Sequence, residues 1–283
     1  MTTPTSISDH GAIGPARGAL VIVGGGEIGP EIWDRFLTLA GGADARIVII
    51  PTAQENLSVT DDDTAKELAQ HGARRIQVLH TRDPKEADTS QFVAPLREAT
   101  GVWLTGGRQW RLADAYLHTR VHQELAALLE RGGVIGGTSA GATIQGSFLV
   151  RGDTAGNELM IGDHVEGFGF LKAAAIDQHL LRRNRQFDLI SVIGEHPELL
   201  GIGIDEGTAV VAQGNRLEVV GASYVAIFDR EQWSGTENTS PNNAGSKGKF
   251  YFLSAGERFD LNDRRIAPPE IQADEKGAKK HSS

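Results

Sequence analysis

The sequence predicts an α/β fold built on a mainly parallel sheet. Apolar runs of four or five residues, rich in Val and Ile, recur along the first half of the chain. Segments with helical periodicity separate these runs, and small turn residues follow most of them. Apolar runs without strict alternation are typical of strands that are covered on both faces, as they are in parallel sheets.

The expected elements of the first half alternate regularly. Each helix is expected to return the chain to the start of the next strand, which makes neighbouring strands parallel. The predicted strands are 20–23, 46–50, 76–79, 102–104 and a run that begins at 134, and the predicted helices are 31–39, 64–70, 92–98 and 112–130, the last in one piece or two.

The second half has a different pattern. A strand at 173–176 and a helix at 185–194 are followed by short, closely spaced apolar runs, which predict antiparallel hairpins at one sheet edge. These runs are 200–204, 209–212, 217–220 and 225–228, and a last strand, 250–253, follows a polar loop at 235–249.

We expect one domain in this chain. The α/β pattern covers residues 19–266, and no internal repeat or linker divides it. Residues 1–18 are predicted to be a flexible N-terminal segment. Residues 267–283 are rich in Pro, Glu and Lys and are predicted to be a disordered tail.

Composition excludes several classes of function. The 283 residues contain no cysteine, which excludes disulfides, thiolate catalysis and thiolate metal sites. The formal net charge of −9 disfavours nucleic acid as a partner, because phosphate backbones would be repelled. No signal peptide is recognised, and no apolar run reaches the ~18 residues that a membrane span needs. We therefore expect a cytoplasmic protein without a membrane partner.

The most informative segment is 132–142, which reads GGVIGGTSAGA. Val134 and Ile135 predict a short buried strand, and Ser139 follows on a turn of small residues with the pattern G-x-S-x-G. A nucleophile on such a turn needs small neighbours, and the amide of Ala140 would point at a developing oxyanion. The alternative is a glycine-rich phosphate-binding turn in which the serine only caps the next helix.

Two later segments offer partners for this serine. His179 follows the strand at 173–176, and Glu206 follows the strand at 200–204. Because catalytic groups of open parallel sheets gather at the carboxyl ends of the strands, we predict that Ser139, His179 and Glu206 form a triad. The alternatives are a surface histidine and a turn glutamate.

Two further patterns allow other interpretations. Gly24, Gly26 and Gly29 match a dinucleotide-binding fingerprint, but the second strand ends at 50 without the acidic residue that binds the ribose. We interpret these glycines as a tight turn beside the same crevice. His118 and His122 have metal-ligand spacing, but no third ligand is evident, which favours a solvated helix face.

Four motifs together resemble the cyanophycinases. These are serine peptidases related to α-aspartyl dipeptidase, and they have a class I glutamine-amidotransferase-like sheet in a three-layer sandwich. The resemblance covers residues 19–228. The motifs are Gly136-Gly137-Thr138-Ser139-Ala140-Gly141-Ala142, Thr105-Gly106-Gly107-x-Gln109, Asp177-Gln178-His179 and Gly203-Ile204-Asp205-Glu206-Gly207-Thr208.

The resemblance implies roles for the site residues. Ser139 would be the nucleophile, His179 the general base and Glu206 its orienting group, while the amides of Gly107 and Ala140 would form the oxyanion hole. No metal or organic cofactor is implied, and a homodimer is an arrangement that the resemblance allows. The positions that match residues around the family's substrate are Gln109, Asp177, Gln178, Arg183 and Arg185.

The implied partner is a peptide substrate. The family cleaves cyanophycin, a poly-aspartate chain with arginine on each side chain, and releases β-aspartyl-arginine dipeptides. This chain has Asp188 where the family usually has a third arginine, and Arg108 where it usually has an acid or an amide. An α-aspartyl dipeptidase and a non-catalytic binding protein for acidic peptides are the alternative functions.

Overall fold

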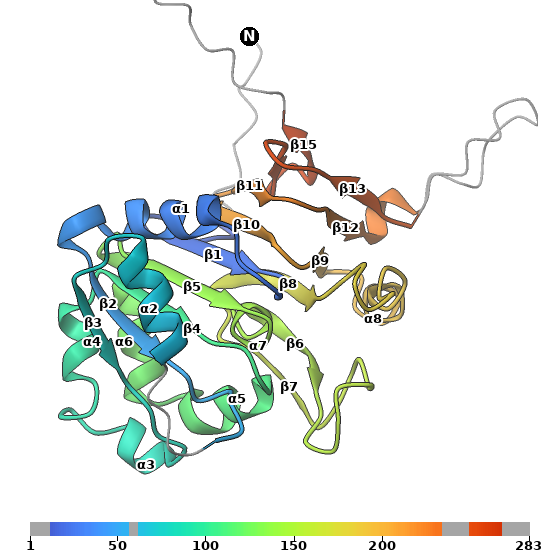
Figure 1. Cartoon of the computed structure of the whole chain (residues 1–283). Helices are drawn as coiled ribbons and strands as arrows, with labels where there is room; N and C mark the ends of the chain where they lie inside the picture. The colour runs from blue at the N-terminus through green and yellow to red at the C-terminus, as the bar shows by residue number, and fades with distance from the viewer. Residues whose placement is uncertain (1–11, 57–61, 234–248, 268–283) are drawn as a thin grey trace, which may run out of the picture.

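The computed structural model describes residues 12–56, 62–233 and 249–267, and in this part of the chain strands and helices alternate up to β5 (Figure 1). The helices are α1 Pro30–Ala40, α2 Asp62–Gln70, α3 Pro84–Ala87, α4 Ala94–Glu98, α5 Gln109–Tyr116, α6 Arg120–Glu130, α7 Ala140–Thr143 and α8 Leu189–Glu195, with short 3-10 helices at Gly42–Asp44 and Arg230–Gln232.

A nine-stranded sheet forms the first layer of strands. Its order is β15-β14-β11-β10-β1-β5-β4-β2-β3. The last five strands in this order, β1, β5, β4, β2 and β3, are parallel. The remaining four, from β10 to β15, pair antiparallel. These strands are β1 Ala19–Val23, β2 Arg46–Ile50, β3 Arg75–Val78, β4 Gly101–Leu104, β5 Val134–Thr138, β10 Thr208–Gln213, β11 Arg216–Gly221, β14 Arg258–Asp260 and β15 Arg265–Ala267.

A second sheet of six strands was not predicted from the sequence. Its order is β13-β12-β9-β8-β6-β7, with β6, β8 and β9 parallel and the other pairs antiparallel. The strands are β6 Gly146–Gly152, β7 His164–Glu166, β8 Leu171–Gln178, β9 Leu200–Ile204, β12 Val225–Asp229 and β13 Tyr251–Leu253. The expectation of one continuous sheet is therefore corrected: the chain is a mixed α/β protein with two sheets.

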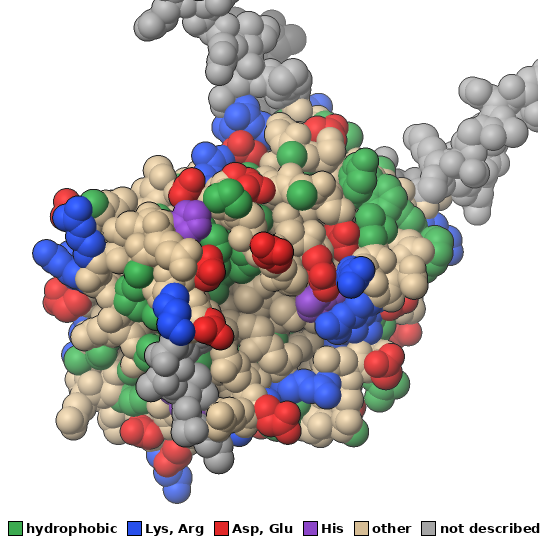
Figure 2. All heavy atoms as spheres, viewed as in Figure 1, with side chains coloured by type: hydrophobic (Ala, Val, Ile, Leu, Met, Phe, Trp, Pro, Cys, Tyr) green, Lys and Arg blue, Asp and Glu red, His purple; other side chains and the backbone are tan. Residues whose placement is uncertain are grey.

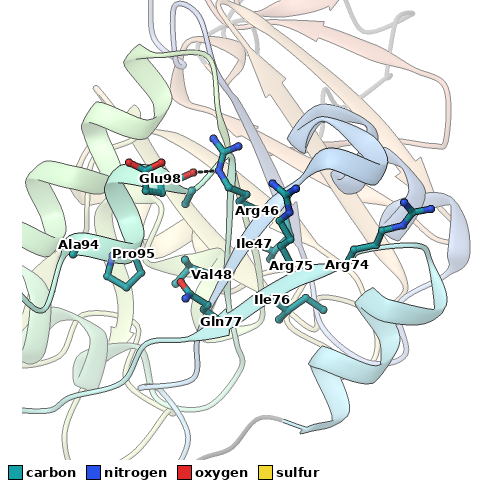
Figure 3. Close-up of a pocket in the computed structure, with 11 residues that line it drawn as sticks. Arg46, Ile47, Val48, Arg74, Arg75, Ile76, Gln77, Ala94, Pro95 and Glu98 are labelled. Carbon is teal, nitrogen blue, oxygen red and sulfur yellow. Dashed lines mark hydrogen bonds between the residues drawn. The ribbon is translucent and has the colours of Figure 1, made fainter.

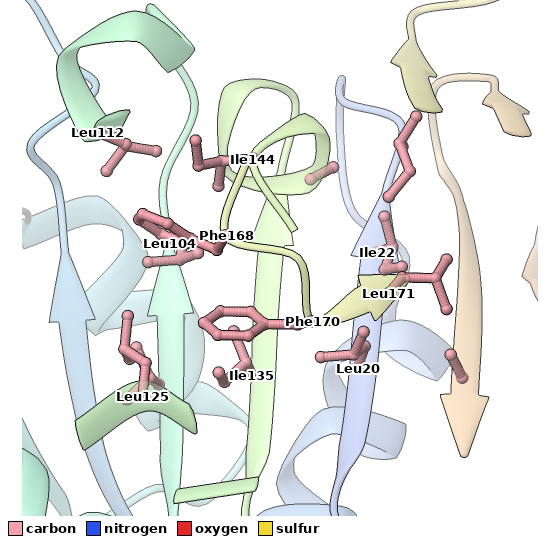
Figure 4. Packing of buried hydrophobic residues seen from close by; sticks show 14 of the residues in the cluster. Leu20, Ile22, Leu104, Leu112, Leu125, Ile135, Ile144, Phe168, Phe170 and Leu171 are labelled. Atoms are coloured by element: carbon pink, nitrogen blue, oxygen red, sulfur yellow. The ribbon is translucent and has the colours of Figure 1, made fainter. Parts of the chain in front are cut away.

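The two sheets share the largest hydrophobic cluster. Leu20 and Ile22 of β1 alternate with Val21 and Val23, so that β1 buries side chains on both faces. On one face this cluster continues through Phe168 and Phe170 to Leu171 of β8 in the second sheet (Figure 4). It also includes Ile202 of β9. On the other face, α1 and α2 pack over the strands. A third cluster joins α8 to the outer face of the second sheet.

Most of the predicted elements are confirmed. The segment 112–130 is two helices, α5 and α6, which is one of the two expected arrangements. The helix α8 begins four residues later than expected, because the preceding residues form a turn that carries site residues. The strands β6, β7, β14 and β15 were not predicted; they are short or interrupted by polar residues. Most of the predicted polar loop and all of the predicted tail after 267 lie outside the described residues.

Part of the expected flexible N-terminal segment is described by the structure. Ile13 donates its amide to Asn215 Oδ1 over 2.8 Å, and its carbonyl accepts from the amide of Lys172 over 2.9 Å. The amide of Gly14 donates to the carbonyl of Gly214. Residues 12–14 therefore pair with β8 and with the β10–β11 turn.

Candidate active site

Ser139 lies on a strained turn between β5 and α7. Its φ of 54° and ψ of −111° are unusual for a residue with a side chain. Its amide donates to the carbonyl of Val23 at the end of β1, over 3.0 Å. A Cβ on Gly137 would come within 2.3 Å of the carbonyl oxygen of Gly141, and a Cβ on Gly141 within 2.1 Å of the carbonyl oxygen of Leu104. Both glycines of the G-x-S-x-G pattern are thus required because neighbouring backbone leaves no room for a side chain on either side of the serine.

The structure brings the three predicted triad residues together. The hydroxyl of Ser139 lies 3.0 Å from His179 Nε2, and His179 Nδ1 lies 2.6 Å from Glu206 Oε1. Because a carboxylate only accepts, Nδ1–H donates to Glu206 and leaves Nε2 of the neutral ring to accept from the Ser139 hydroxyl. The serine follows a strand of the first sheet, whereas His179 and Glu206 follow β8 and β9 of the second. The site therefore lies where the two sheets meet.

The loop after β1 holds this arrangement. The carbonyl of Gly24 accepts from the amide of His179 over 2.8 Å, and the carbonyl of Gly25 accepts from the amide of Gly207 over 2.9 Å. A Cβ on Gly25 would lie 2.3 Å from Cε1 of the His179 ring, and a Cβ on Gly26 would lie 2.7 Å from Glu206 Oε2. Of the three predicted glycines, Gly24 and Gly26 lie in the turn beside the triad, whereas Gly29 is the N-cap of α1. Gly25 and Gly26 leave room for the histidine and the glutamate.

Asp205 positions the turn that carries His179, and the sequence reasoning missed it. Its Oδ1 accepts from the amides of Leu181 and Arg182, at 2.9 Å each, and its Oδ2 accepts from the hydroxyl of Ser223 at 2.7 Å. The side chain is buried. An Asp directly before the predicted Glu206, at the end of a buried strand, was the available signal, because buried carboxylates need several donors.

Burial lowers the pKa of His179 below its usual range. Loss of solvation is the largest cause; the hydrogen bond with Glu206 opposes it, and the positive charge of Arg183 acts in the same direction as burial. The ring is therefore neutral at pH 7, which is the form that a general base requires.

The two backbone amides predicted to form the oxyanion hole belong to different elements near the serine. Ala140 is the first residue of α7, and Gly106 lies close enough that a Cβ on it would come 3.4 Å from Ser139 Cβ. Gly107 follows, with a φ of +141° that favours glycine. Among the described residues, neither the amide of Ala140 nor that of Gly107 has an acceptor. Both are available to an oxygen bound beside Ser139.

Four of the five predicted substrate residues are buried. Both carboxylate oxygens of Asp177 pair with Arg151, at 2.8 and 3.0 Å, and both side chains are at most 2% exposed. Arg185 donates to the side chain and carbonyl of Gln178. Gln109 donates to the carbonyls of Val150 and Arg151, at 2.9 Å each. These groups brace the ends of β6 and β8 instead of lining open surface.

Arg183 is the exposed member of the predicted set. Its amide donates to the carbonyl of His179 over 3.0 Å, and its charge acts on that ring. Asp188 pairs with Arg151 over 2.5 Å, which makes it part of the buried ion-pair group. Arg108 borders a cavity beside Gly107. Figure 2 shows this face of the molecule hollowed, with acidic and basic side chains around the hollow.

His118 and His122 lie away from the triad and have other partners. His122 packs on Phe168 and its Nε2 donates to the carbonyl of that residue, while His118 pairs with Glu166. No group of three or more metal-ligating side chains, and no helix long and apolar enough to cross a membrane, occurs in 12–56, 62–233 or 249–267.

A cavity of 680 Å³ lies beside β2, β3 and α4 (Figure 3). It is bordered by Arg46 and Arg75, the first residues of β2 and β3. Ser139 follows the last residue of β5, so this cavity is at the opposite ends of the parallel strands. None of the predicted site residues lines it.

Comparison with solved structures relates the fold to peptidases. The structure of a peptidase from an acI-B1 Actinobacterium superposes with a TM-score of 0.64 at 24% identity, and the match covers 87% of this chain and 98% of that one. The match shows that the two chains share a mixed α/β fold.

Sequence comparison identifies the family. Residues 20–220 match the model of peptidase family S51. A cyanophycinase from Geminocystis herdmanii is 34% identical over 230 residues, covering 78% of this chain and 84% of the relative. A cyanophycinase from Nostoc sp. is 34% identical over 265 residues, which is 88% of each chain. The chain belongs to peptidase family S51, and it is a serine-type peptidase.

Proposed function

We propose that this protein is a cyanophycinase-like peptidase that hydrolyses aspartyl or β-aspartyl bonds through Ser139, His179 and Glu206. The observation that carries the proposal is the continuous hydrogen-bond chain from the serine hydroxyl to Nε2 of the imidazole, and from Nδ1 to the carboxylate. The cyanophycinases that this chain resembles act on cyanophycin, and we extend that substrate class to this chain.

In the first step, the Ser139 oxygen attacks the scissile carbonyl carbon while His179 Nε2 takes the hydroxyl proton. Glu206 keeps the ring in the tautomer that accepts at Nε2, and its charge stabilises the imidazolium that forms. The carbonyl oxygen becomes an oxyanion that the amides of Ala140 and Gly107 receive. The C–N bond then breaks, and the imidazolium gives its proton to the leaving amine.

In the second step, water hydrolyses the acyl-enzyme. His179 accepts a proton from the water, the hydroxide attacks the ester carbonyl, and the same two amides receive the oxyanion again. The Ser139 oxygen leaves and takes the proton back from the imidazolium. With cyanophycin as the substrate, the expected products are β-aspartyl-arginine dipeptides.

Among the predicted substrate residues, Arg183 is the one that we propose to contact substrate, because it is exposed beside His179. A guanidinium suits a substrate carboxylate. Asp177, Gln178, Arg185 and Gln109 support the crevice from behind, since most of their polar groups are engaged with protein partners. Gln109 Oε1 is buried and has no partner among the described residues. The class I glutamine-amidotransferase-like three-layer description, the cytoplasmic location and the homodimer stay predictions.

The test is turnover by the wild type and by Ser139→Ala. Purified protein is incubated with cyanophycin and with α-aspartyl dipeptides, and the products are identified by mass. We expect Ser139→Ala to lose several orders of magnitude in kcat with an unchanged circular dichroism spectrum. Ser191→Ala is the matched control, because its exposed hydroxyl bonds only to the carbonyl of Asp188 among the described residues.

The outcomes separate the alternatives. Turnover of α-aspartyl dipeptides without turnover of the polymer would identify a dipeptidase. Binding of acidic peptides without turnover of any substrate by the wild type would identify a binding protein. Near wild-type turnover in Ser139→Ala would rule out the serine mechanism.

A further inference from the structure

A small cavity beside the oxyanion loop carries a net positive charge, since two arginines and one glutamate line it. It has a volume of 270 Å³ and is lined by Glu55, Gly107, Arg108, Trp110, Arg111 and Thr154. It lies next to the reaction site, because it contains Gly107 itself, and Gly106 approaches the Ser139 side chain. A group bound there is therefore within about one substrate residue of the scissile carbonyl.

Backbone contacts hold the arginines of this cavity in place. The amide of Arg108 and Nη1 of Arg111 both donate to the carbonyl of Ala53, at 2.8 and 3.1 Å. The Arg111 guanidinium also lies over the ring of Trp110, at 5.2 Å from its centroid. A nearby third arginine, Arg82, donates to the carbonyls of Gln54 and Glu55. The fold thus holds the guanidinium groups of Arg111 and Arg82 before any ligand binds, and it fixes the backbone of Arg108 beside them.

These guanidinium groups retain unused donors. Nη1 of Arg108 and Nε of Arg111 are buried and have no hydrogen-bond partner among the described residues. Neither arginine forms an ion pair with a described carboxylate. Because a buried N–H without an acceptor is costly, the cavity favours an acceptor supplied from outside the protein.

The electrostatics of the cavity agree with this geometry. Arg108 and Arg111 contribute two positive charges and Glu55, which is exposed, one negative charge. Burial lowers the pKa of Arg111, and the charges of Arg82 and Arg108 act in the same direction, which is the effect of clustered cations. The amino end of α5, which begins at Gln109, adds its partial positive charge at the same place.

We propose that Arg108 and Arg111 form an anion subsite that binds a substrate carboxylate next to the scissile bond. The substrate class that fits is an acidic peptide, in which Asp or Glu adjoins the cleaved bond. This inference refines the proposed peptidase function and rests on it for the placement of the scissile carbonyl.

Binding to an inactive variant tests the subsite without relying on turnover. Ser139→Ala is titrated calorimetrically with the dipeptide amide Asp-Asp-NH2 and with its two neutral counterparts, Asn-Asp-NH2 and Asp-Asn-NH2. We expect one of the two replacements to weaken binding by about ten-fold or more, because a hydrogen bond to a charged group is lost. The replacement that weakens binding shows on which side of the scissile bond the bound carboxylate lies.

The variants locate the effect. Adding Arg108→Gln to Ser139→Ala should weaken Asp-Asp-NH2 to the affinity of the sensitive neutral peptide, and should leave that neutral peptide unchanged. Arg75→Gln is the matched control, since it removes the same charge at the opposite end of the strands.

Three results would overturn the subsite: equal affinity for all three peptides, no measurable binding of any of them, or equal effects of Arg108→Gln and Arg75→Gln. Failure of the proposed function gives a different result. In that case the wild type would not hydrolyse any peptide, while the carboxylate-dependent and Arg108-dependent binding would remain.

Discussion

At the scale of single residues, the candidate site depends on how tightly backbone and side chains approach one another. Gly25 has a φ of +115°, and its missing side chain leaves space that the His179 ring fills. Serine chemistry tolerates little displacement of the base, since a misplacement of about 1 Å can cost roughly a hundred-fold in rate. A glycine that takes no part in the chemical step can therefore control the reaction rate through the position of the base.

Gly25→Ala should lower kcat about a hundred-fold or more because the new methyl group displaces the imidazole. Gly41→Ala is the matched control: its φ of +107° is similar, and a Cβ there meets nothing within 4 Å. Both variants carry backbone strain on the order of 1–3 kcal/mol, measured by urea unfolding. Equal kcat values in the two variants would show that strain alone, and not the lost space beside His179, lowers the rate.

The pH profile should depend on Arg183. Proton uptake by His179 stops general-base catalysis, so kcat/KM falls as the pH decreases through the histidine pKa, which burial and Arg183 hold below 6.5. Arg183→Gln removes a positive charge that disfavours imidazolium, so the pKa rises and the acidic limb moves to higher pH. The limb is measured for the wild type, Arg183→Gln and Arg75→Gln. An unchanged limb in Arg183→Gln would contradict this account of the pKa.

At the scale of elements, an ion-pair group fastens β6 to β8 and to the start of α8. Arg151 extends from β6 to Asp177 of β8 and to Asp188, the residue before α8. Burial alone would lower the pKa of Arg151, but the two carboxylates raise it above its usual value. In this group, the two carboxylates therefore compensate the buried positive charge of Arg151.

Arg151→Met should destabilise the protein by about 3–5 kcal/mol, because Asp177 is left buried with only the more distant Arg185, at 3.9 Å, as a positive charge. Urea unfolding measures the change. Arg265→Met is the control, since its pair with Asp263 is exposed and should change stability by only about 0.5 kcal/mol or less. Adding Asp177→Leu to Arg151→Met should recover part of the loss. Similar stabilities for Arg151→Met and Arg265→Met would show that the buried pair does not fasten these elements.

At the scale of the whole molecule, the candidate site depends on how the two sheets pack. Ser139 follows a strand of the first sheet, while His179 and Glu206 follow strands of the second. The hydrophobic cluster between the sheets therefore sets the distance between the nucleophile and its base. The cluster under α1 and α2 lies on the other face of the first sheet and does not link the two.

Ile202→Ala, between the sheets, should lower both stability and kcat, whereas Ile49→Ala, under α1 and α2, should lower stability alone. Both side chains are fully buried, and each truncation should cost about 2–5 kcal/mol. Stability is measured by urea unfolding and kcat well below the unfolding midpoint. Equal kcat losses at equal destabilisation would mean that the packing between the sheets has no special influence on the site.

The sequence by itself determined the elements of the first half of the fold and the residues that the structure brings together as a triad. Both rest on local signals: apolar runs ending in small residues, and a serine, histidine or glutamate just after a strand. Those local signals predicted that Ser139, His179 and Glu206 meet, because active-site groups gather at the carboxyl ends of parallel strands. The strands belong to two different sheets, however, and the packing of these sheets brings the three side chains together.

Only the tertiary structure decided the second sheet, the space that Gly25 and Gly26 leave for the triad, and the pairing of Asp177 with Arg151. Strand β7 is short, and polar residues interrupt the apolar pattern of β6, so the sequence shows no clear strand periodicity for either. The contacts of Gly25, Asp205 and Arg151 join residues far apart in the chain. No local pattern reports such contacts, because their energy arises from burial and hydrogen bonding that exist only once the sheets have packed.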